Sequence, residues 1–331
     1  MNAPTTLSAV NPAKLLREQI RAGRHTTVTT GMAPGHLQAN LVILPADWAE
    51  EFASFCAANP KPCPLIARSA LGDPALPSLG WDIDVRSDLP RYRVFREGAV
   101  VSEETDITAL WRDDLIAFAL GCSYSFEAAL LEAAVPIRHI EQGKKVCTYL
   151  TRLDTVPAGR LHGRMVVSMR NFTVPNAIRA IEITSRFPRV HGAPIHFGDP
   201  AAIGIADIDK PEFGGEPDIR PGEVPLFWAC GVTPQAVIEA AKPPFCITHK
   251  AGHMLVRPIE RGVPRGLMLG ATRSSRSRWY RFAVDWRRAQ TTLRTMCRRF
   301  EVKRRTSLGQ RPFSAASAHS LLSSTAGLSI S

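Results

Sequence analysis

The sequence contains no apolar run that approaches the roughly 18–20 residues needed by a membrane-spanning helix. Its first residues, MNAPTTLSAVNPAK, lack the charged-then-apolar pattern of a secretory signal. The seven cysteines are an odd number and no two are spaced C-x-x-C, so we expect reduced thiols rather than a disulfide framework. These absences predict a cytoplasmic protein with no membrane partner.

The sequence also lacks the common cofactor and metal motifs. The segment GMAPGHLQAN at 31–40 has two glycines but matches neither the P-loop nor G-x-G-x-x-G, so no nucleotide is expected. His249 and His253 flank a turn and could join His191 and His196 in a zinc or iron site. Neither pair has a known ligand spacing such as H-E-x-x-H. We therefore expect no cofactor and no metal.

The basic charge is concentrated at one end. From Arg257 onward there are 16 Lys and Arg against 3 Asp and Glu, whereas the preceding residues hold 25 against 27. The near-neutral body gives no reason to expect nucleic acid. The Arg- and Ser-rich tail at 258–331 suits either a basic arm or an extension, extended or partly helical, that does not pack on the body. The abrupt change in composition favours the extension.

The body at 1–257 alternates helical and strand patterns. Helices are predicted by apolar periodicity and start signals at 11–23, 46–60, 105–121, 123–133, 173–187 and 233–242. Their expected caps include Asn11, Asp47 in a capping-box-like arrangement with Glu50, and Thr233. Compact apolar strands are predicted at 163–171 and 224–231, and the segment 245–256 is predicted to form a strand, a turn at Ala251-Gly252 and another strand. This alternation predicts an α/β fold of two lobes with mixed, partly parallel sheets.

One loop carries two titratable rings. The stretch RFPRVHGAPIHFGDP at 186–200 places His191 and His196 five residues apart, a spacing that fits neither a helix face nor a strand face. Glycines and prolines around them could aim both rings, with Asp199, into one pocket. Histidine titrates near neutral pH, so the pair suits proton transfer. The alternative is that a ring hydrogen-bonds the backbone and holds the loop.

A second candidate site surrounds Cys122, just before the predicted helix at 123–133. A helix N-terminus lowers a thiol's pKa and binds anions, so Cys122 could be a nucleophile, or the N–H groups of Ser123, Tyr124 and Ser125 could cradle a carboxylate. Glu127, one turn later, could be an acid or base. The alternative is a small buried thiol with Glu127 as a dipole partner. We favour anion cradling.

Further candidates follow from residue type and place. Cys230 also lies between a strand and a helix, so both interpretations of Cys122 apply to it. Arg91, Arg93 and Arg170 could bind a substrate carboxylate through the bidentate guanidinium fork. For any single arginine the alternative is a structural ion pair.

Several long segments together resemble the hydro-lyase family that is also called the D-glutamate cyclase family. They include GMAPGHLQANLVILP at 31–45, LGCSYSFEAALLEA at 120–133, SRFPRVHGAPIHFGDP at 185–200, VPLFWACGVTPQ at 224–235 and ITHKAGHML at 247–255. The resemblance spans about residues 11–256. It implies an α/β protein of two intertwined lobes and a lyase activity, and it brings no metal or cofactor motif.

The function expected from the residues and this resemblance is loss of water from a small amino or hydroxy carboxylate. Cyclisation of D-glutamate to 5-oxo-D-proline is the candidate reaction. It needs a base for the amine, an acid for the departing oxygen, and cationic or N–H donors for the carboxylates. The alternatives are a non-catalytic binding protein for an acidic metabolite and a metal-dependent hydrolase. A homo-oligomer is left open.

Overall fold

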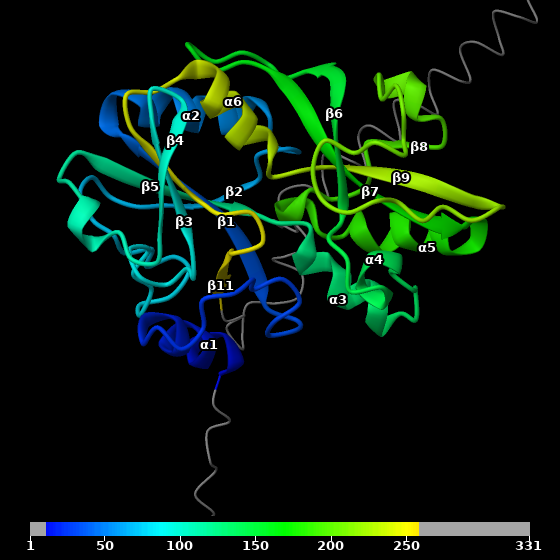
Figure 1. Ribbon diagram of the computed structural model, residues 1–331, viewed down its shortest axis with the longest axis horizontal. Helices are drawn as coiled ribbons and strands as arrows, with labels where there is room; N and C mark the ends of the chain where they lie inside the picture. Colours follow the sequence, from blue (N-terminus) through cyan, green and yellow to red (C-terminus); the bar gives the residue numbers. More distant parts are fainter. Residues whose placement is uncertain (1–10, 258–331) are drawn as a thin grey trace, which may run out of the picture. The chain divides into compact units, whose positions relative to one another are not determined.

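The computed structural model describes residues 11–257, which build two β-sheets with helices packed on them (Figure 1). The tail at 258–331, predicted to be extended or partly helical, lies outside the described residues. None of the helices that are described is long and apolar enough to cross a membrane.

The first sheet has seven strands in the order β2-β5-β1-β10-β3-β4, with β11 paired to β1. Their bounds are β1 Leu37–Pro45, β2 Leu65–Arg68, β3 Tyr92–Arg96, β4 Ala99–Glu104, β5 Leu115–Gly121, β10 Cys246–His249 and β11 Leu255–Arg257. The second sheet has the order β6-β7-β9-β8. Its strands are β6 Cys147–Asp154, β7 Arg164–Thr173, β8 His196–Phe197 and β9 Glu223–Ala229. The chain therefore leaves the first sheet after β5 and returns to it with β10 and β11.

The helices connect and cover these strands. They are α1 Pro12–Arg21, α2 Ala46–Ala58, α3 Tyr124–Glu132, α4 Arg138–Glu141, α5 Val174–Thr184 and α6 Thr233–Ala241, with short 3-10 turns η1 Thr108–Leu110, η2 Pro188–Val190 and η3 Pro200–Ile203. Five of the six predicted helices and all three predicted strand segments are thereby confirmed. The mixed α/β class is confirmed as well.

The expected parallel pairing is wrong, because every strand pair among the described residues is antiparallel. Strands β1 and β2 are joined through α2 and run in the same direction, as a crossover predicts. However, β5 lies between them and pairs with both in the opposite direction. The helix crossovers therefore connect strands that are not neighbours.

The helix expected at 105–121 is also wrong. Its second half is strand β5, which is buried along its whole length and pairs with β1 over seven positions. A continuous apolar run such as LIAFALG fits a buried strand as well as a buried helix segment, so only the pairing partner decides between them.

Two of the three predicted helix caps are wrong. Asn11 does cap α1, accepting a hydrogen bond from Ala13 N at 3.0 Å. By contrast, the residue before α2 is Pro45, with no side-chain cap. Thr233 lies inside α6 and uses its hydroxyl on strand β7, where Val166 N donates to it at 3.0 Å.

Each sheet packs apolar side chains on both faces. Helices α2 and α6 cover one face of the first sheet with Trp48, Phe52 and Val237, and the loops at 70–90 cover the other. Helices α3 and α5 pack on the second sheet around Trp228. These three cores hold the strand ends that form the site described below.

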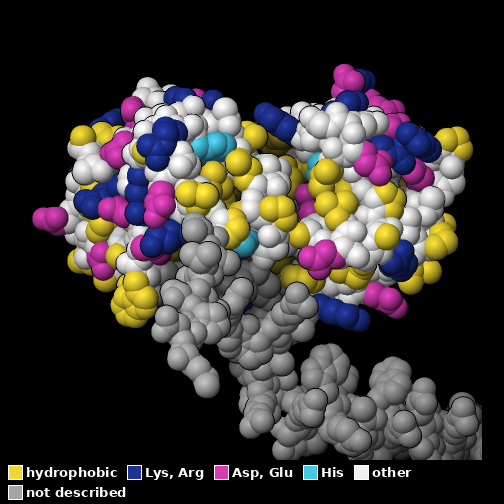
Figure 2. Space-filling model, turned by 90° about the horizontal axis from the view of Figure 1, so that it is seen from below, with side chains coloured by type: hydrophobic (Ala, Val, Ile, Leu, Met, Phe, Trp, Pro, Cys, Tyr) yellow, Lys and Arg dark blue, Asp and Glu magenta, His cyan; other side chains and the backbone are white. Residues whose placement is uncertain are grey.

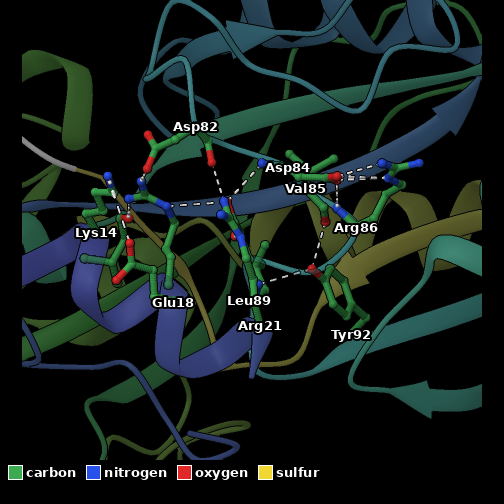
Figure 3. Close-up of polar contacts among 12 residues, drawn as sticks. Lys14, Glu18, Arg21, Asp82, Asp84, Val85, Arg86, Leu89 and Tyr92 are labelled. Atoms are coloured by element: carbon green, nitrogen blue, oxygen red, sulfur yellow. Dashed lines mark hydrogen bonds and ion pairs between the residues drawn. The ribbon is translucent and has the colours of Figure 1, made fainter. Parts of the chain in front are cut away.

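Helix α1 is attached to the loop at 82–92 by ion pairs (Figure 3). The Arg21 guanidinium donates to both carboxylate oxygens of Asp88, at 2.5 and 2.9 Å. Arg17 is fully buried and donates to Asp82 at 2.6 Å and to the carbonyl of Val256 at 2.9 Å. At the start of β3, Tyr92 donates its hydroxyl to the Val85 carbonyl of the same loop at 2.8 Å. These contacts hold α1 against this loop and against Val256 of β11.

Candidate functional site

A cavity of about 700 Å³ lies where β1, the start of α3, the α4–β6 connection and the end of β10 come together. The loop at 28–36 contributes a further wall. This loop is attached to the β10–β11 turn, because Thr29 N donates to the Gly252 carbonyl at 2.8 Å. The volume suits a small ligand. Of the predicted site residues, the cavity lining includes Arg93, Cys122, Ser123, Ser125, Glu127 and Cys230.

The centre of the site is a buried ion pair between Glu127 on α3 and Arg170 on β7. Arg170 Nε donates to Glu127 Oε1 at 2.9 Å, and Arg170 Nη2 contacts the same oxygen. Arg170 also donates to Ser168 at 3.1 Å and to Ser123 at 3.2 Å. Its guanidinium carbon lies 5.1 Å from the centre of the Phe126 ring. Arg170 therefore holds Glu127 in place. It forms the structural ion pair that the sequence analysis gave as the alternative to carboxylate binding.

Glu127 is kept as a carboxylate despite its burial. Burial raises the pKa of Glu127, but the charges of Arg170 and His139 and the hydrogen bonds from both outweigh it, so the pKa falls below its ordinary value. His139 on α4 places Nε2 3.2 Å from Glu127 Oε1. Every contact of the carboxylate runs to Oε1. The second oxygen, Oε2, has no hydrogen bond within residues 11–257.

The expected low pKa of Cys122 is wrong. Burial raises the pKa of the Cys122 thiol to about 12, and burial raises the pKa of Cys230 as well. The N-terminus of a helix carries only about half a unit of positive charge. Its attraction for a thiolate is therefore smaller than the free energy lost when the thiolate is removed from water. Both thiols therefore line the cavity in their neutral form, which does not favour nucleophilic catalysis.

The predicted anion cradle at the start of α3 is only partly available. Ser125 N donates to the Cys122 carbonyl at 3.0 Å. The Ser125 hydroxyl accepts from Gln38 N at 2.9 Å and donates to the Gln38 carbonyl at 3.2 Å. Ser125 therefore connects α3 to β1. The Ser123 hydroxyl contacts Arg170, and its backbone N–H has no partner among the described backbone groups.

Three cationic side chains line the cavity. Arg93 on β3 lines it, and the hydrogen bond of Arg93 to Glu103 uses only Nε, at 3.2 Å. Lys144 and Lys145 also line the cavity and are exposed. Since Arg170 already neutralises Glu127, the remaining charge of the lining is positive. Elsewhere on the described surface, as drawn in Figure 2, basic and acidic side chains are interspersed.

His191 lies beside the site rather than in its lining. It is buried, and its Nδ1 donates to the Lys61 carbonyl at 2.7 Å. Burial lowers the pKa of His191 to about 4, so the ring is neutral near pH 7. Its backbone is left-handed, with φ of 81°. The adjacent Arg189 carbonyl would lie 2.0 Å from a Cβ on Gly121, so this loop packs directly against the turn that carries Cys122.

Four other predicted residues lie outside the cavity lining: Arg170, which contacts Glu127 from β7, and His196, Asp199 and Arg91. His196 Nε2 pairs with the Asp199 carbonyl at 2.7 Å, and its ring stacks on Phe227. Asp199 accepts from Ala201 N at 2.9 Å and caps η3. The Arg91 carbonyl accepts from Lys250 N at 3.0 Å. These contacts stabilise loops, and a role of these side chains in catalysis stays a prediction.

His249 lines the cavity at the end of β10. Its Nδ1 accepts from Leu41 N at 3.2 Å, and burial lowers its pKa to about 4. Within the described part of the chain, no three His, Cys, Asp or Glu side chains are grouped as a metal ion would require.

Sequence reasoning missed Gln38, Asn40 and His139. The first two lie on one face of β1, whose nine residues are all buried, and both line the cavity. Two carboxamides at alternate positions of an otherwise apolar strand, LQANLVILP, are a usable signal, because buried polar groups need partners. His139 gave no comparable signal, since its partner Glu127 belongs to another helix.

Several known proteins are similar to this chain. A family model described as D-glutamate cyclase matches residues 116–258. A Bordetella petrii protein named "Putative hydro-lyase" is 62% identical over 243 residues, covering 73% of this chain and 92% of that protein. A Verminephrobacter eiseniae protein of the same name is 60% identical over 240 residues, covering 72% and 88%. A solved nitrogen repressor-like protein from Methanococcus jannaschii aligns with a TM-score of 0.31 and 10% identity over 73% of this chain and 97% of that one, too weakly to support an argument.

Proposed function

This chain belongs to the D-glutamate cyclase family, and on that premise we propose that it removes water from a small amino dicarboxylate, with D-glutamate to 5-oxo-D-proline as the reaction. The observation that carries the proposal is the Glu127 carboxylate. It is held in the cavity wall by Arg170 and His139 through Oε1, while Oε2 is available to a ligand.

The reaction forms a bond between the amine nitrogen and the side-chain carboxyl carbon, and breaks one carbon–oxygen bond. The ammonium nitrogen gives up two protons, and the departing carboxylate oxygen takes two and leaves as water. Glu127 is placed to bind the ammonium and to take its first proton, which frees the nitrogen lone pair for the attack. The attack makes the nitrogen acidic, and its second proton passes to the departing oxygen. His139, which contacts the same carboxylate, is placed to return a proton to the departing oxygen.

The substrate's carboxylates need cations. Arg93, Lys144 and Lys145 line the cavity, and the Arg93 Nη groups can bind a carboxylate as a fork. The N–H of Ser123 at the start of α3 adds a donor for the oxyanion of the tetrahedral intermediate. Cys122 and Cys230 enter this scheme as neutral walls of the pocket.

In this scheme the loop of His191 has a positioning role. This loop packs on Gly121, and Gly121 leads directly into Cys122 and α3. The loop that carries His191 therefore supports the start of α3, the helix on which Glu127 lies. Proton transfer by the ring itself is less favoured, because burial keeps the pKa of His191 near 4 and the ring lies outside the lining.

The test is incubation of the full chain with D-glutamate, L-glutamate and a panel of small hydroxy acids, following loss of one water by mass. We expect turnover of D-glutamate and a fall in kcat of roughly 10²–10⁴-fold in Glu127→Gln. The matched control is Glu132→Gln, an exposed residue of the same helix, which should leave kcat unchanged. Binding of a dicarboxylate without any turnover would favour a binding protein instead.

A further inference from the structure

We infer that Gln38 and Asn40 on β1 determine specificity by binding the amino group of the substrate. This inference rests on the proposed function and assigns the residues that select amino dicarboxylates over hydroxy and unsubstituted dicarboxylates. It starts from an unpartnered polar group. Gln38 is 3% exposed and lines the cavity, yet its Oε1 has no hydrogen-bond partner among the described residues.

The backbone around Gln38 is already engaged. Gln38 N donates to the Ser125 hydroxyl, and the Gln38 carbonyl accepts from Cys122 N at 3.1 Å. These bonds fix the residue against the start of α3 and leave the carboxamide as its only free polar group. A buried carbonyl without a donor costs free energy, so such a group in a pocket indicates a ligand that donates a hydrogen bond.

Asn40 offers a second acceptor on the same face of the strand. Its one hydrogen bond runs from Nδ2 to the Gly121 carbonyl at 3.5 Å, which leaves Oδ1 available. Gly231 makes room for this side chain, since a Cβ there would lie 1.9 Å from Asn40 Nδ2. Any larger residue at 231 would displace the carboxamide from the cavity.

The third acceptor is Glu127 Oε2. It comes from the helix that Ser125 attaches to Gln38, so all three acceptors belong to one wall. Three acceptors match the three N–H groups of an alkylammonium ion. A hydroxyl group donates only one hydrogen bond, and a methylene donates none. The wall therefore favours an amine at the carbon next to the carboxylate.

The test compares D-glutamate, D-2-hydroxyglutarate and glutarate, which differ only in the group at that carbon. Dissociation constants come from thermal-shift titration of the full chain, which needs no turnover. We expect the wild type to bind D-glutamate most tightly. In Gln38→Leu the preference for D-glutamate over glutarate should fall by about 10-fold, the effect of one hydrogen bond to a charged group.

The matched control is Gln235→Leu. Gln235 lines the same cavity, but its Nε2 already donates to the His249 carbonyl at 3.1 Å. The control should retain the preference. If Gln38→Leu does not fold, Gln38→Glu decides, because it keeps the size and an acceptor. It should weaken glutarate binding and preserve D-glutamate binding.

The outcomes separate the two proposals. An unchanged preference in folded Gln38→Leu, or equal binding of all three ligands by the wild type, overturns the inference and leaves the dicarboxylate pocket intact. Loss of D-glutamate binding together with glutarate binding in Gln38→Glu overturns it too. If none of the three ligands binds the wild type, the proposed function itself fails.

Discussion

The buried pair of Glu127 and Arg170 supports a quantitative prediction. Replacing Arg170 with Met keeps most of the side-chain volume beside Phe126 and Trp228 and removes the charge. Glu127, which is 4% exposed, would then keep only the His139 ring as a hydrogen-bonding partner. The carboxylate would remain buried without its main counter-ion.

The expected cost is large. Removing one partner of a buried ion pair destabilises a protein by about 3–5 kcal/mol, because the other charge is left uncompensated. At about 2–4 °C of melting temperature per kcal/mol for a domain of this size, Arg170→Met should melt roughly 6–20 °C below the wild type. Arg164→Met, an exposed arginine on the same strand, is the control and should change the melting temperature by little.

The pH dependence tests the reasoning more sharply. In the wild type the Glu127 pKa is lowered, so its stabilisation is present at neutral pH and is lost as pH falls below the ordinary value of 4.5. In Arg170→Met, burial without the cation should raise the pKa, so the carboxylate destabilises the fold at neutral pH and protonation relieves it. The difference in melting temperature should therefore narrow between pH 8 and pH 4.5.

The decisive assay is thermal unfolding of wild type, Arg170→Met and the double variant Arg170→Met/Glu127→Gln across that pH range. At neutral pH the double variant should regain much of the melting temperature that Arg170→Met loses, because neither member of the buried ion pair is charged any longer. The electrostatic explanation would be refuted if Arg170→Met lowered the melting temperature equally at every pH, or if the double variant melted no higher than Arg170→Met. Either result would show instead that Arg170 acts mainly through packing.

Other predictions concern the cavity. Arg93→Met should raise KM for D-glutamate roughly 10–100-fold with a smaller change in kcat, because a carboxylate clamp acts in both the ground and transition states; steady-state kinetics would check this. Cys122 should react slowly with iodoacetamide at pH 7.5, since its pKa is about 12, and rapid labelling in a peptide map would contradict its burial. Gly231→Ala, whose Cβ would lie 1.9 Å from Asn40 Nδ2, should destabilise the fold by about 1–3 kcal/mol and weaken D-glutamate binding.

The family could be identified from the sequence, and the similarity of the relatives confirms it. Long motifs such as LGCSYSFEAALLEA carry that information because their residues are contiguous. The same motif placed Cys122, Ser123 and Glu127, which line the cavity. It could not show that Ser125 is used to attach β1, since Gln38 lies 87 residues away.

The histidine loop shows a different limit. Its sequence correctly indicated a shaped turn, as the left-handed φ of His191 shows. Whether the His191 and His196 rings enter a pocket depended on which backbone groups contact them. The structure places the Lys61 carbonyl against His191 and the Asp199 carbonyl against His196, contacts that no local pattern encodes.

The sequence by itself determined the local elements and the kinds of chemistry available. Helix α1 follows from Asn11, Pro12 and a periodic apolar face, all within one short segment. Tertiary structure alone decided that 115–121 is a strand, that neighbouring strands are antiparallel, and that Arg170 meets Glu127 from 43 residues away. The physical reason is that propensity and capping act between near neighbours, whereas strand pairing and the pairing of buried charges depend on which distant segments come into contact.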